Sequence, residues 1–281
     1  MVESVRSPDD ARLEPYLRVR DRDAMGPDGR PGLFVGESPL VIEAMLRTPG
    51  VETISVLASE RQRERAVELI ESSRSSRAGT ADPLVLVAPD DVLNAVVGFD
   101  IHRGFLAVGR RPPLRTVREV VPAPEHAALL LLVEEINNID NIGQLFRNAA
   151  AFGCDAVVLS PGCHDPLYRK SLRVSCGHAL RVPFARSASW DADLAWIGGD
   201  ARCELVGMTG GGDRTLREAA ERLRALEPRR VAAVVGAEFA GLRPETLAAC
   251  RHRVRIPMAP GVDSLNVGVA AGVVLSRLTE R

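Results

Sequence analysis

The first hundred residues alternate between two hydrophobic periodicities, and each change of period indicates a change of secondary structure. Short apolar runs typical of β-strands are followed by amphipathic stretches typical of helices. The expected strands are residues 33–36, 52–58, 83–88 and 104–109, and the expected helices are residues 39–47, 60–72 and 90–97. This alternation predicts a small α/β domain in the N-terminal part of the chain.

A second alternation of strands and helices begins near Ala127. The expected strands are residues 129–133, 156–160, 180–184, 204–208, 231–235 and 253–258. They are continuous apolar runs, which are typical of a parallel sheet that helices cover on both faces. Residues 110–126 combine four prolines with a basic run, and we place the domain boundary there.

Residues 133–153 predict a strand followed by a helix that carries an arginine off its apolar face. Asn141 is expected to cap this helix, since asparagine is a preferred N-cap residue. The apolar stripe of the helix consists of Ile142, Leu145, Phe146, Ala149 and Phe152. Arg147 lies on another face, near the carboxyl ends of the strands, where α/β proteins bind ligands. Periodicity alone favours a solvated arginine over a functional one.

Residues 234–247 predict a strand that ends at Gly236, a short turn, and a helix that begins near Pro244. Glycine at the end of a strand lets a ligand approach the backbone closely. Glu238 follows in the turn, where its carboxylate could accept hydrogen bonds from a ribose or an amino group. An ordinary strand-to-helix turn explains the same residues equally well.

Residues 255–275 predict a loop with two prolines and a glycine, then a helix that Ser264 or Asn266 begins. The side chains of this helix are apolar nearly all round, and such a helix must be buried on every side. It is the last element expected in the chain, where a surface position is usual. We therefore predict that a second copy of the chain covers it in a homodimer.

Composition excludes several classes of protein. The 281 residues are 46% hydrophobic and 26% charged, as in ordinary soluble proteins. No apolar run reaches the roughly 18 residues that span a bilayer, and the N-terminus lacks the apolar core of a signal peptide. We therefore expect a cytoplasmic protein. The five cysteines form no C-x-x-C pair, so neither a disulfide framework nor a metal site is expected.

The formal net charge is −1, so a nucleic-acid surface would have to be a local patch. Two stretches without acidic residues qualify, residues 103–118 and residues 169–186. Their candidate phosphate-binding side chains are Arg110, Arg111, Arg169, Lys170 and Arg173. The glycine-rich loop 207–213 is a weaker candidate, for a nucleotide. It has neither the lysine of a P-loop nor the spacing of a dinucleotide-binding loop.

Taken together, the segments around Arg147, Glu238 and Asn266 resemble the three signature motifs of the SpoU branch of the SPOUT methyltransferases. The matching residues are Asn141, Gly143, Arg147, Phe152 and Gly153, then Gly236, Glu238, Gly241 and Leu242, then Ser264, Leu265, Asn266, Val267, Ala270 and Ala271. Residues 165–184 are also similar to the family, with Ser175, Gly177 and Pro183 in place. The resemblance covers about residues 127–281. Three motifs in order outweigh the nonfunctional interpretations of Arg147 and Glu238.

This resemblance implies a fold and an activity. Residues 127–281 are expected to form a Rossmann-like parallel sheet with a trefoil knot, which chain physics alone would never suggest. Residues 1–110 are similar in arrangement to the small ribosomal-protein-like α/β RNA-binding domain of several SpoU enzymes, and residues 111–126 are the expected linker. The implied reaction is the 2′-O-methylation of a ribose in ribosomal or transfer RNA, with S-adenosyl-L-methionine as the methyl donor.

The resemblance also implies which residues form the site. The expected cofactor pocket is lined by Gly236, Ile256, Met258 and Leu265, with the loop at Thr209 closing one side. The expected catalytic residues are Arg147, Asn141, Ser264, Asn266 and Glu238.

Arg147 is expected to act electrostatically. A free guanidinium stays protonated, so it should stabilise the forming alkoxide and a neighbouring phosphate rather than act as a base. Asn141 and Ser264 would orient the arginine or the ribose. In the family, this arginine typically reaches the cofactor of the partner subunit.

One departure from the family concerns Ala237, which stands where the second motif usually has asparagine. Alanine cannot make the hydrogen bonds of an amide, so a contact made in relatives is missing here or is supplied by another residue. Two alternative functions remain open. A catalytically silent RNA-binding dimer of the same fold would not bind the cofactor. A nucleotide-binding enzyme built on residues 207–213 would bind ATP instead.

Overall fold

The computed structural model describes residues 1–17, 32–77, 81–98, 104–237 and 240–280. The chain forms two compact units. Unit 1 comprises Met1–Pro113 and Asp165–Arg181, and unit 2 comprises Leu114–His164 and Val182–Arg281. The segment Asp165–Arg181 therefore belongs to the same unit as the N-terminal residues, although the resemblance groups it with the C-terminal part of the chain.

Unit 1 is built on a five-stranded sheet with the strand order β1-β4-β3-β5-β2. The strands are β1 (Val2–Ser4), β2 (Leu33–Glu37), β3 (Thr53–Ser59), β4 (Leu84–Ala88) and β5 (Phe105–Arg110). Strands β1, β4 and β3 run parallel, whereas β5 pairs antiparallel with β3 and with β2. The four predicted strands are confirmed to within one residue at each end. Strand β1 was not predicted, because three residues carry too little periodicity.

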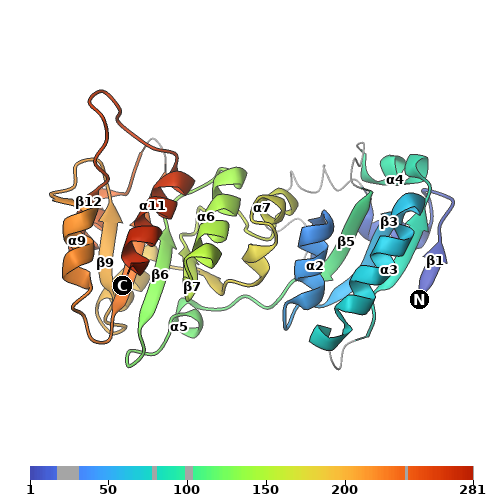
Figure 1. Cartoon of the computed structure of the whole chain (residues 1–281), viewed down its shortest axis with the longest axis horizontal. Helices are drawn as coiled ribbons and strands as arrows, with labels where there is room; N and C mark the ends of the chain where they lie inside the picture. The colour runs from blue at the N-terminus through green and yellow to red at the C-terminus, as the bar shows by residue number, and fades with distance from the viewer. Residues whose placement is uncertain (18–31, 78–80, 99–103, 238–239, 281) are drawn as a thin grey trace. The chain divides into compact units, whose positions relative to one another are not determined.

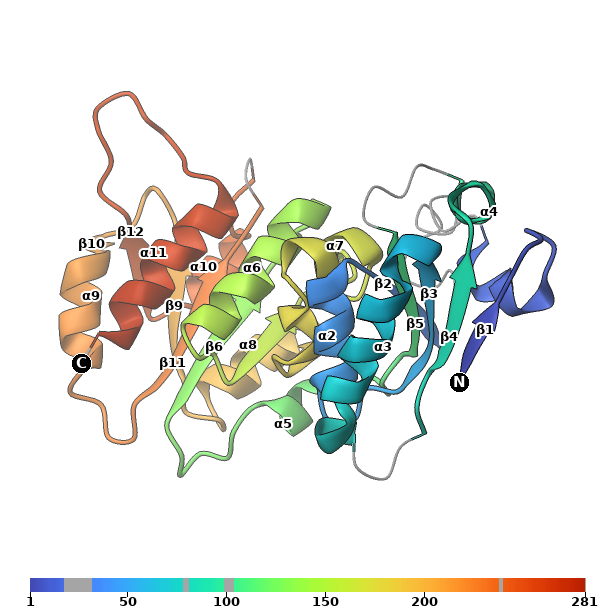
Figure 2. The same cartoon turned by 45° about the vertical axis from the view of Figure 1, so that its right-hand side comes forward.

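Helices pack on both faces of this sheet (Figures 1 and 2). They are η1 (Ala11–Tyr16), α2 (Pro39–Arg47), η2 (Glu60–Gln62), α3 (Arg63–Ser72), η3 (Arg74–Arg77) and α4 (Asp90–Val97), and the later segment adds α7 (Arg169–Val174) and η4 (His178–Leu180). Tyr16 of η1 and Leu93 of α4 share one apolar cluster with Leu57 of β3. On the other face, Gly36 leaves the space that the Met45 side chain of α2 fills. Helix α7 packs against β2, and a Cβ atom at Gly177 would lie 2.5 Å from the Ala44 Cβ atom.

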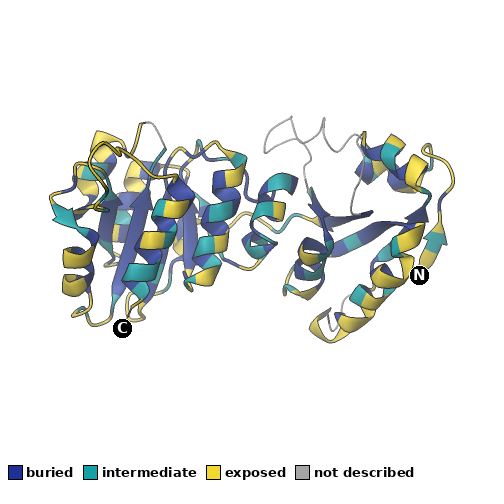
Figure 3. Ribbon diagram, turned by 45° about the horizontal axis from the view of Figure 1, so that its top comes forward, coloured by how far each residue is buried: buried dark blue, intermediate teal, exposed yellow. Residues whose placement is uncertain are grey.

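Unit 2 is built on a seven-stranded sheet with the order β10-β12-β9-β11-β6-β7-β8. The strands are β6 (Ala128–Val133), β7 (Ala156–Leu159), β8 (Phe184–Arg186), β9 (Glu204–Met208), β10 (Arg214–Thr215), β11 (Arg230–Val235) and β12 (His252–Arg255). Every pairing between neighbours is parallel. The parallel sheet predicted from continuous apolar runs is therefore confirmed, and strands β6, β7, β9 and β11 are buried along most of their length (Figure 3).

The sheet of unit 2 is covered on both faces, as predicted. Helices α6 (Ile139–Ala151), α9 (Leu216–Leu223) and α11 (Val267–Thr279) lie on one face, and α8 (Trp190–Gly198) and α10 (Pro244–Ala249) lie on the other (Figures 1 and 2). The short helix α5 (Val117–Val120) packs against β8. The predicted apolar stripe of α6 is fully buried at Ile142, Leu145, Phe146 and Ala149.

Two predicted strand boundaries in the second half of the chain are wrong. The strand expected at residues 180–184 is absent, because η4 ends at Leu180 and β8 begins only at Phe184. That apolar run crosses from unit 1 to unit 2, and a local pattern does not separate the two. Strand β12 ends at Arg255 rather than at residue 258, since Pro257 has no amide hydrogen to continue the ladder. In the part of the chain that the structure describes, no helix has the length and hydrophobicity to cross a membrane.

Candidate functional site

Three strands of unit 2 end side by side at one edge of the sheet. Strands β12, β9 and β11 are parallel neighbours, and the residues that directly follow them are Ile256, Thr209 and Gly236. The carboxyl ends of parallel strands form the edge at which α/β proteins usually bind ligands. The structure therefore brings these three predicted cofactor residues to one edge.

The loop after β9 is packed mainly through its backbone. The Thr209 amide donates to the Val254 carbonyl (3.0 Å), and Arg255 Nη1 donates to the Gly212 carbonyl (2.6 Å). A Cβ atom at Gly212 would lie 2.6 Å from the Arg255 nitrogen, so only glycine fits there. A Cβ atom at Gly210 would lie 3.9 Å from a carbonyl oxygen of the loop that follows β12. The two loops are therefore in contact, backbone against backbone.

The turn after β11 is closed in a similar way. The Gly241 amide donates to the Ala237 carbonyl (2.8 Å), and Gly241 has a φ of 66°, which favours glycine. A Cβ atom at Gly236 would lie 2.5 Å from the Gly241 carbonyl carbon and 2.7 Å from the Leu242 nitrogen. Gly236 is therefore required by the close approach of the backbone. Glu238, the catalytic residue predicted in this turn, lies outside the described residues.

Asn141 and Asn266 are brought together from distant parts of the chain. Asn266 Nδ2 donates a hydrogen bond to Asn141 Oδ1 (2.8 Å). Asn266 is also the N-cap of α11, and its Oδ1 accepts from the amides of Gly268 (2.9 Å) and Val269 (3.3 Å). Between the two start positions left open from the sequence, the structure selects Asn266. One side chain thus begins α11 and ties it to α6.

The prediction that Asn141 caps α6 is wrong. The helix begins at Ile139, and Asn138 is its N-cap, with Oδ1 accepting from the amides of Asp140 (2.9 Å) and Asn141 (3.1 Å). A cap must precede the amides that it satisfies. Asn141 lies inside the first turn and is 3% exposed, so its side chain is directed to α11 instead of to its own helix.

Helices α6 and α11 also meet in the turns that follow. Asn148 Nδ2 donates to the Gly268 carbonyl (2.6 Å). A Cβ atom at Gly268 would lie 2.9 Å from the side chain of Gln144, so the two helices approach closely at this glycine. Polar contacts from Asn141 and from Asn148 of α6 therefore both hold the start of α11.

Arg147 is exposed on α6, off the apolar stripe. Its guanidinium forms no hydrogen bond or ion pair with any residue that the structure describes. Of the other predicted residues, Ser264 is exposed, Leu265 is 37% exposed, and Ile256 and Met258 are half-buried. The structure therefore places Arg147 at the surface with its positive charge free of these neighbours.

The predicted phosphate-binding residues all lie in unit 1. Arg110 forms an exposed ion pair with Glu52 (2.8 Å). Arg111 is better buried, and it bonds Asp165 (2.5 Å) and the Leu33 carbonyl (2.9 Å). Arg110 can exchange its partner for a phosphate at little cost, because an exposed ion pair contributes little.

Arg169 is buried, whereas we predicted it on an exposed RNA-binding surface. It is 8% exposed, and its Nη1 donates to Glu37, which is itself 8% exposed. Arg173 lies 3.4 Å from the same carboxylate but remains 41% exposed, and Lys170 between them is half-buried. A buried guanidinium paired with a carboxylate stabilises the fold and does not reach RNA. Arg169 is therefore removed from the predicted RNA surface.

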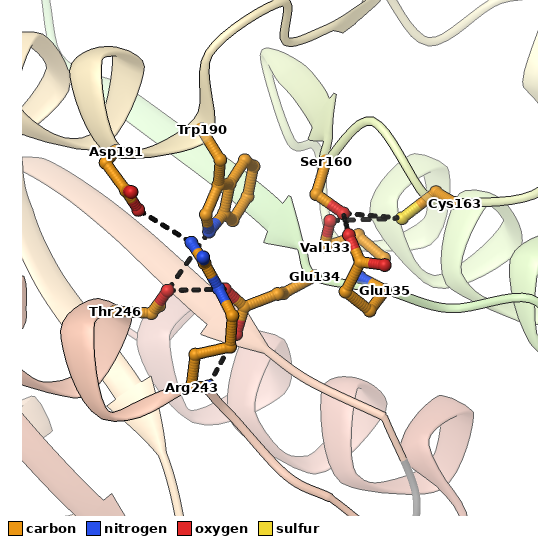
Figure 4. A network of polar contacts seen from close by, with 9 residues as sticks. All are labelled: Val133, Glu134, Glu135, Ser160, Cys163, Trp190, Asp191, Arg243 and Thr246. Carbon is orange, nitrogen blue, oxygen red and sulfur yellow. Dashed lines mark hydrogen bonds and ion pairs between the residues drawn. The ribbon is translucent and has the colours of Figure 1, made fainter.

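A buried carboxylate beside the site was not predicted from the sequence. Glu134 directly follows β6 and is 1% exposed. Its Oε1 accepts from Arg243 Nε (2.9 Å) and from Thr246 Oγ1, and its Oε2 accepts from the Arg243 amide (2.9 Å) (Figure 4). The bond to Glu134 raises the pKa of Arg243. The sequence did contain a signal, since a carboxylate at the end of a buried apolar strand needs polar partners.

The next residue, Glu135, faces away from this network (Figure 4). Its amide donates to Ser160 Oγ (2.8 Å), and Ser160 Oγ donates to its Oε1 (2.7 Å). Its φ of 54° is uncommon for a residue other than glycine. This backbone turn sends the two neighbouring carboxylates in opposite directions, so that one is buried under α10 and the other is exposed.

Cys163 takes part in the contacts around Ser160, since its Sγ lies 3.6 Å from Ser160 Oγ and donates to the Val133 carbonyl (3.2 Å) (Figure 4). All five are free thiols, and burial raises the pKa of Cys154 to about 12. Burial, with a smaller contribution from the charge of Glu134, also raises the pKa of Cys250 to about 12. Among the described residues, no cluster of histidine, cysteine and carboxylate side chains is placed to hold a metal ion.

Comparison with known proteins places this site in a family. The model of the SpoU rRNA Methylase family matches residues 128–276, which include all three motifs. The chain belongs to the SpoU rRNA methylase family. It is 39% identical to an uncharacterised tRNA/rRNA methyltransferase of Mycobacterium bovis, over 97% of this chain and 90% of that protein. The 23S rRNA (guanosine-2′-O-)-methyltransferase RlmB of Acinetobacter baylyi is 32% identical over 67% of this chain and 75% of its own length.

Solved structures agree with the assignment to the SpoU family. A crystal structure of an RNA 2′-O ribose methyltransferase superposes with a TM-score of 0.72, at 29% identity, over 98% of both chains. The SpoU methyltransferase AviRb of Streptomyces viridochromogenes, in complex with AdoMet, has a TM-score of 0.71 at 22% identity over 96% of this chain and 98% of that chain. The AviRb structure establishes likeness of fold alone. This SpoU-family chain is an RNA methyltransferase, as the three motifs indicate.

Proposed function

We propose that this SpoU methyltransferase transfers a methyl group from S-adenosyl-L-methionine to a ribose 2′-hydroxyl in ribosomal or transfer RNA. The observation that carries the proposal is the hydrogen bond between Asn266 and Asn141 (2.8 Å). It joins the first turns of α11 and α6, which start from the sheet edge where the loops after β9, β11 and β12 begin. The names of two relatives support the ribose as acceptor, since both are 2′-O-methyltransferases.

The loops at this edge fit S-adenosyl-L-methionine, a zwitterionic nucleoside derivative. Gly212 and Gly236 sit where any Cβ atom would meet neighbouring backbone, so peptide groups rather than side chains line the loops there. Thr209 adds a hydroxyl group, and the apolar residues are Ile256, Met258 and Leu265. A mostly apolar pocket with a few polar groups is typical of cofactor sites. These five positions, Gly236 included, would hold the cofactor, which supplies an electrophilic methyl group on a positively charged sulfur.

Arg147 is the residue on which the proposed chemistry depends most. The 2′-oxygen must lose its proton as it attacks, so negative charge develops on it in the transition state. A permanently charged guanidinium that no described residue neutralises is suited to stabilise that charge and a neighbouring phosphate. The proton would pass to phosphate or water, because arginine itself does not act as a base at neutral pH.

The other motif residues would position the reactants. Asn141 and Asn266 hold the starts of α6 and α11 together, and thereby keep the helix of Arg147 in a fixed place. Ser264 precedes α11 and is exposed, so its hydroxyl is accessible to a ribose. We retain Glu238 as a candidate for a hydrogen bond to substrate or cofactor. Correct positioning alone supplies much of the rate, since the methyl donor is already activated.

We also propose that the enzyme works as a homodimer. Val269 and Val273 are 52% and 41% exposed at i, i+4 positions of α11, and Leu265 in the preceding loop is 37% exposed. An exposed row of large apolar side chains marks an interaction surface. A second copy of the chain would cover this row around a twofold axis. Arg147 would then act at the cofactor of the partner subunit, as the resemblance implies.

We also propose a role for each part of the chain. Residues 1–110 would bind substrate RNA, residues 111–126 would link the domains, and residues 127–281 would form the knotted catalytic domain. Arg110, Arg111, Lys170 and Arg173 are the side chains that we propose for RNA phosphates.

The test begins with ribose-methylation mapping of total RNA from cells with and without the gene. The purified protein is then given labelled S-adenosyl-L-methionine and a transcript in which the identified nucleotide is 2′-deoxy. Methyl transfer should be lost with this transcript and retained with the ribose form. Equal transfer to both would exclude the ribose 2′-oxygen, and failure to bind the cofactor would favour a silent RNA-binding protein.

A further inference from the structure

Glu134 contacts both ends of the turn that follows β11. Its backbone amide donates to the Val235 carbonyl (2.9 Å), directly before Gly236. Its Oε2 accepts from the Arg243 amide (2.9 Å), at the start of α10. One residue at the end of β6 thus hydrogen-bonds to the chain immediately before and immediately after this turn.

The carboxylate of Glu134 has donors on every side. Besides the Arg243 amide, it accepts from Arg243 Nε (2.9 Å) and Thr246 Oγ1, and Thr246 Oγ1 accepts in turn from Trp190 Nε1 (3.1 Å). The far end of Arg243 reaches Asp191 (2.6 Å) in solvent, where Asp191 is 65% exposed. A carboxylate that is 1% exposed loses its hydration, so these hydrogen bonds replace the contacts that water would otherwise make.

We propose that Glu134 is a positioning residue for cofactor binding, which fixes the backbone of Gly236 relative to the neighbouring loops through its bonds to both ends of the turn. This inference rests on the proposed use of S-adenosyl-L-methionine. The turn is held from within only by the bond between the Gly241 amide and the Ala237 carbonyl, as far as its described residues go. Without the Glu134 carboxylate, the Arg243 side chain would keep only the exposed Asp191 among the partners described above. The end of the turn at Arg243 would then be free to shift.

The test compares Glu134→Gln with the wild type by calorimetric titration of S-adenosyl-L-methionine into the full-length protein. Glutamine has nearly the same shape but keeps one acceptor oxygen in place of two. Its NH2 group would face hydrogen-bond donors of Arg243 or Thr246 and could not accept from them. We expect the Kd for the cofactor to rise by roughly tenfold or more, as when a charged hydrogen bond is lost. In turnover assays the KM for the cofactor should rise, while the KM for RNA and the rate at saturating cofactor stay near wild type. Glu134→Asp, which keeps both oxygens and the charge, should give an intermediate Kd.

Two control variants separate positioning from a general loss of stability. Arg230→Met removes a guanidinium that is 2% exposed at the opposite end of β11, where it bonds the carbonyls of Ala201 (2.8 Å) and Ala123 (2.7 Å). It should destabilise unit 2 without changing the cofactor Kd, measured at a temperature where all variants are folded. Asp191→Asn removes only the outer ion pair and should leave both properties unchanged. If Arg230→Met raises the Kd as much as Glu134→Gln does, the proposal is wrong.

Hydrogen exchange provides a readout that does not depend on the cofactor. In Glu134→Gln the amides of Gly241 and Arg243 should exchange faster, while the Thr209 amide, which bonds Val254, should exchange at the wild-type rate. Unchanged exchange at Gly241 and Arg243 overturns the inference whether or not the cofactor binds. If the wild type itself does not bind S-adenosyl-L-methionine but the exchange pattern is as expected, the proposed function fails while Glu134 still positions the turn.

Discussion

Arg169 of unit 1 and Arg147 of unit 2 show two opposite uses of the same side chain. Arg169 is 8% exposed and is paired with Glu37, whereas Arg147 is exposed and pairs with none of the residues that the structure describes. A guanidinium that is already desolvated and neutralised contributes to folding, and it has no charge left to offer a substrate. A guanidinium held in solvent by a buried helix contributes little to folding, and its full charge is available for an incoming anion. Exposure and pairing, rather than residue type, therefore distinguish a structural arginine from a candidate catalytic one.

The same contrast extends to the segments around these arginines. The segment Asp165–Arg181 is tied to the rest of unit 1 by ion pairs, Arg111 with Asp165 and Arg169 and Arg173 with Glu37. The seam between α6 and α11 in unit 2 is instead held by neutral amide and carbonyl groups. Arg147 lies on α6, and none of the described residues forms an ion pair with it, which is the condition that the proposed mechanism requires.

The largest effect is expected from breaking the buried pair in unit 1. Arg169→Met should lower the free energy of unfolding by about 3–5 kcal/mol, because the buried Glu37 would lose its close partner and keep the more distant Arg173 (3.4 Å). Urea denaturation measures this change. Arg173→Met, at the more exposed partner of the same carboxylate, is the matched control and should cost less than about 1 kcal/mol. Equal losses for the two variants would contradict the distinction between a buried and an exposed pair.

Arg147→Ala should slow methyl transfer without changing stability. The free energy of unfolding and the affinity for S-adenosyl-L-methionine should stay close to wild type, since the apolar stripe of α6 is untouched. Single-turnover methyl transfer to the identified RNA should fall by roughly 10²–10³, the usual effect of losing one preorganised donor to developing negative charge. Arg147→Lys should recover little of this rate, because lysine lacks the planar pair of donors. Transfer by Arg147→Ala at the wild-type rate would remove this residue from the mechanism.

A smaller effect is expected at Asn266, where stability and function meet. Asn266→Ala removes the cap of α11 and the bond to Asn141, so we expect a loss of about 1–2 kcal/mol together with slower methyl transfer. Asn266→Ser keeps a capping oxygen but cannot reach Asn141 with an amide. Comparison of the two variants by denaturation and single-turnover kinetics separates the cap from the link between helices. If serine restores the rate as well as the stability, the link to Asn141 has no role in catalysis.

The smallest effects are expected on the proposed RNA surface of unit 1. Lys170→Ala and Arg110→Ala should each weaken RNA binding several-fold and reduce the slope of log K against log salt by about one for each phosphate that is no longer neutralised. Filter binding over a range of salt concentrations measures both quantities. Lys170 is the only lysine of the chain, so protection of its side chain from amine-specific labelling by bound RNA is an independent check. Unchanged slopes in both variants would place the RNA elsewhere.

Deletion of residues 1–110 is a poor substitute for these point variants. It would remove Glu37, the partner of Arg169, and strand β2, against which α7 packs. The remaining chain would lose both the carboxylate that Arg169 contacts and the strand that covers its helix, so a loss of RNA binding could not be separated from a loss of folding.

Several features of this protein were determined by the sequence alone. Continuous apolar runs predicted the parallel sheet of unit 2, and the helical period predicted the buried stripe of α6, because burial on one or two faces of an element imposes a local pattern. The three motifs in their order indicated the SpoU family, and the family match confirms it. Gly236 after β11 and the glycines in the loop after β9 marked the sheet edge at which the candidate site lies.

Only the tertiary structure decided which polar groups meet. Glu37 and Arg169 are 132 residues apart, Asn141 and Asn266 are 125 apart, and Glu134 and Arg243 are 109 apart. Hydrophobic periodicity describes how one segment meets the core and contains no information about which distant segment supplies a charge or an amide. For this reason the sequence could propose Arg169 for RNA phosphates and Arg147 for catalysis, but not which of the two is buried and paired. The tertiary structure distinguishes them. It places the buried carboxylate of Glu37 beside Arg169, whereas none of the described side chains pairs with Arg147.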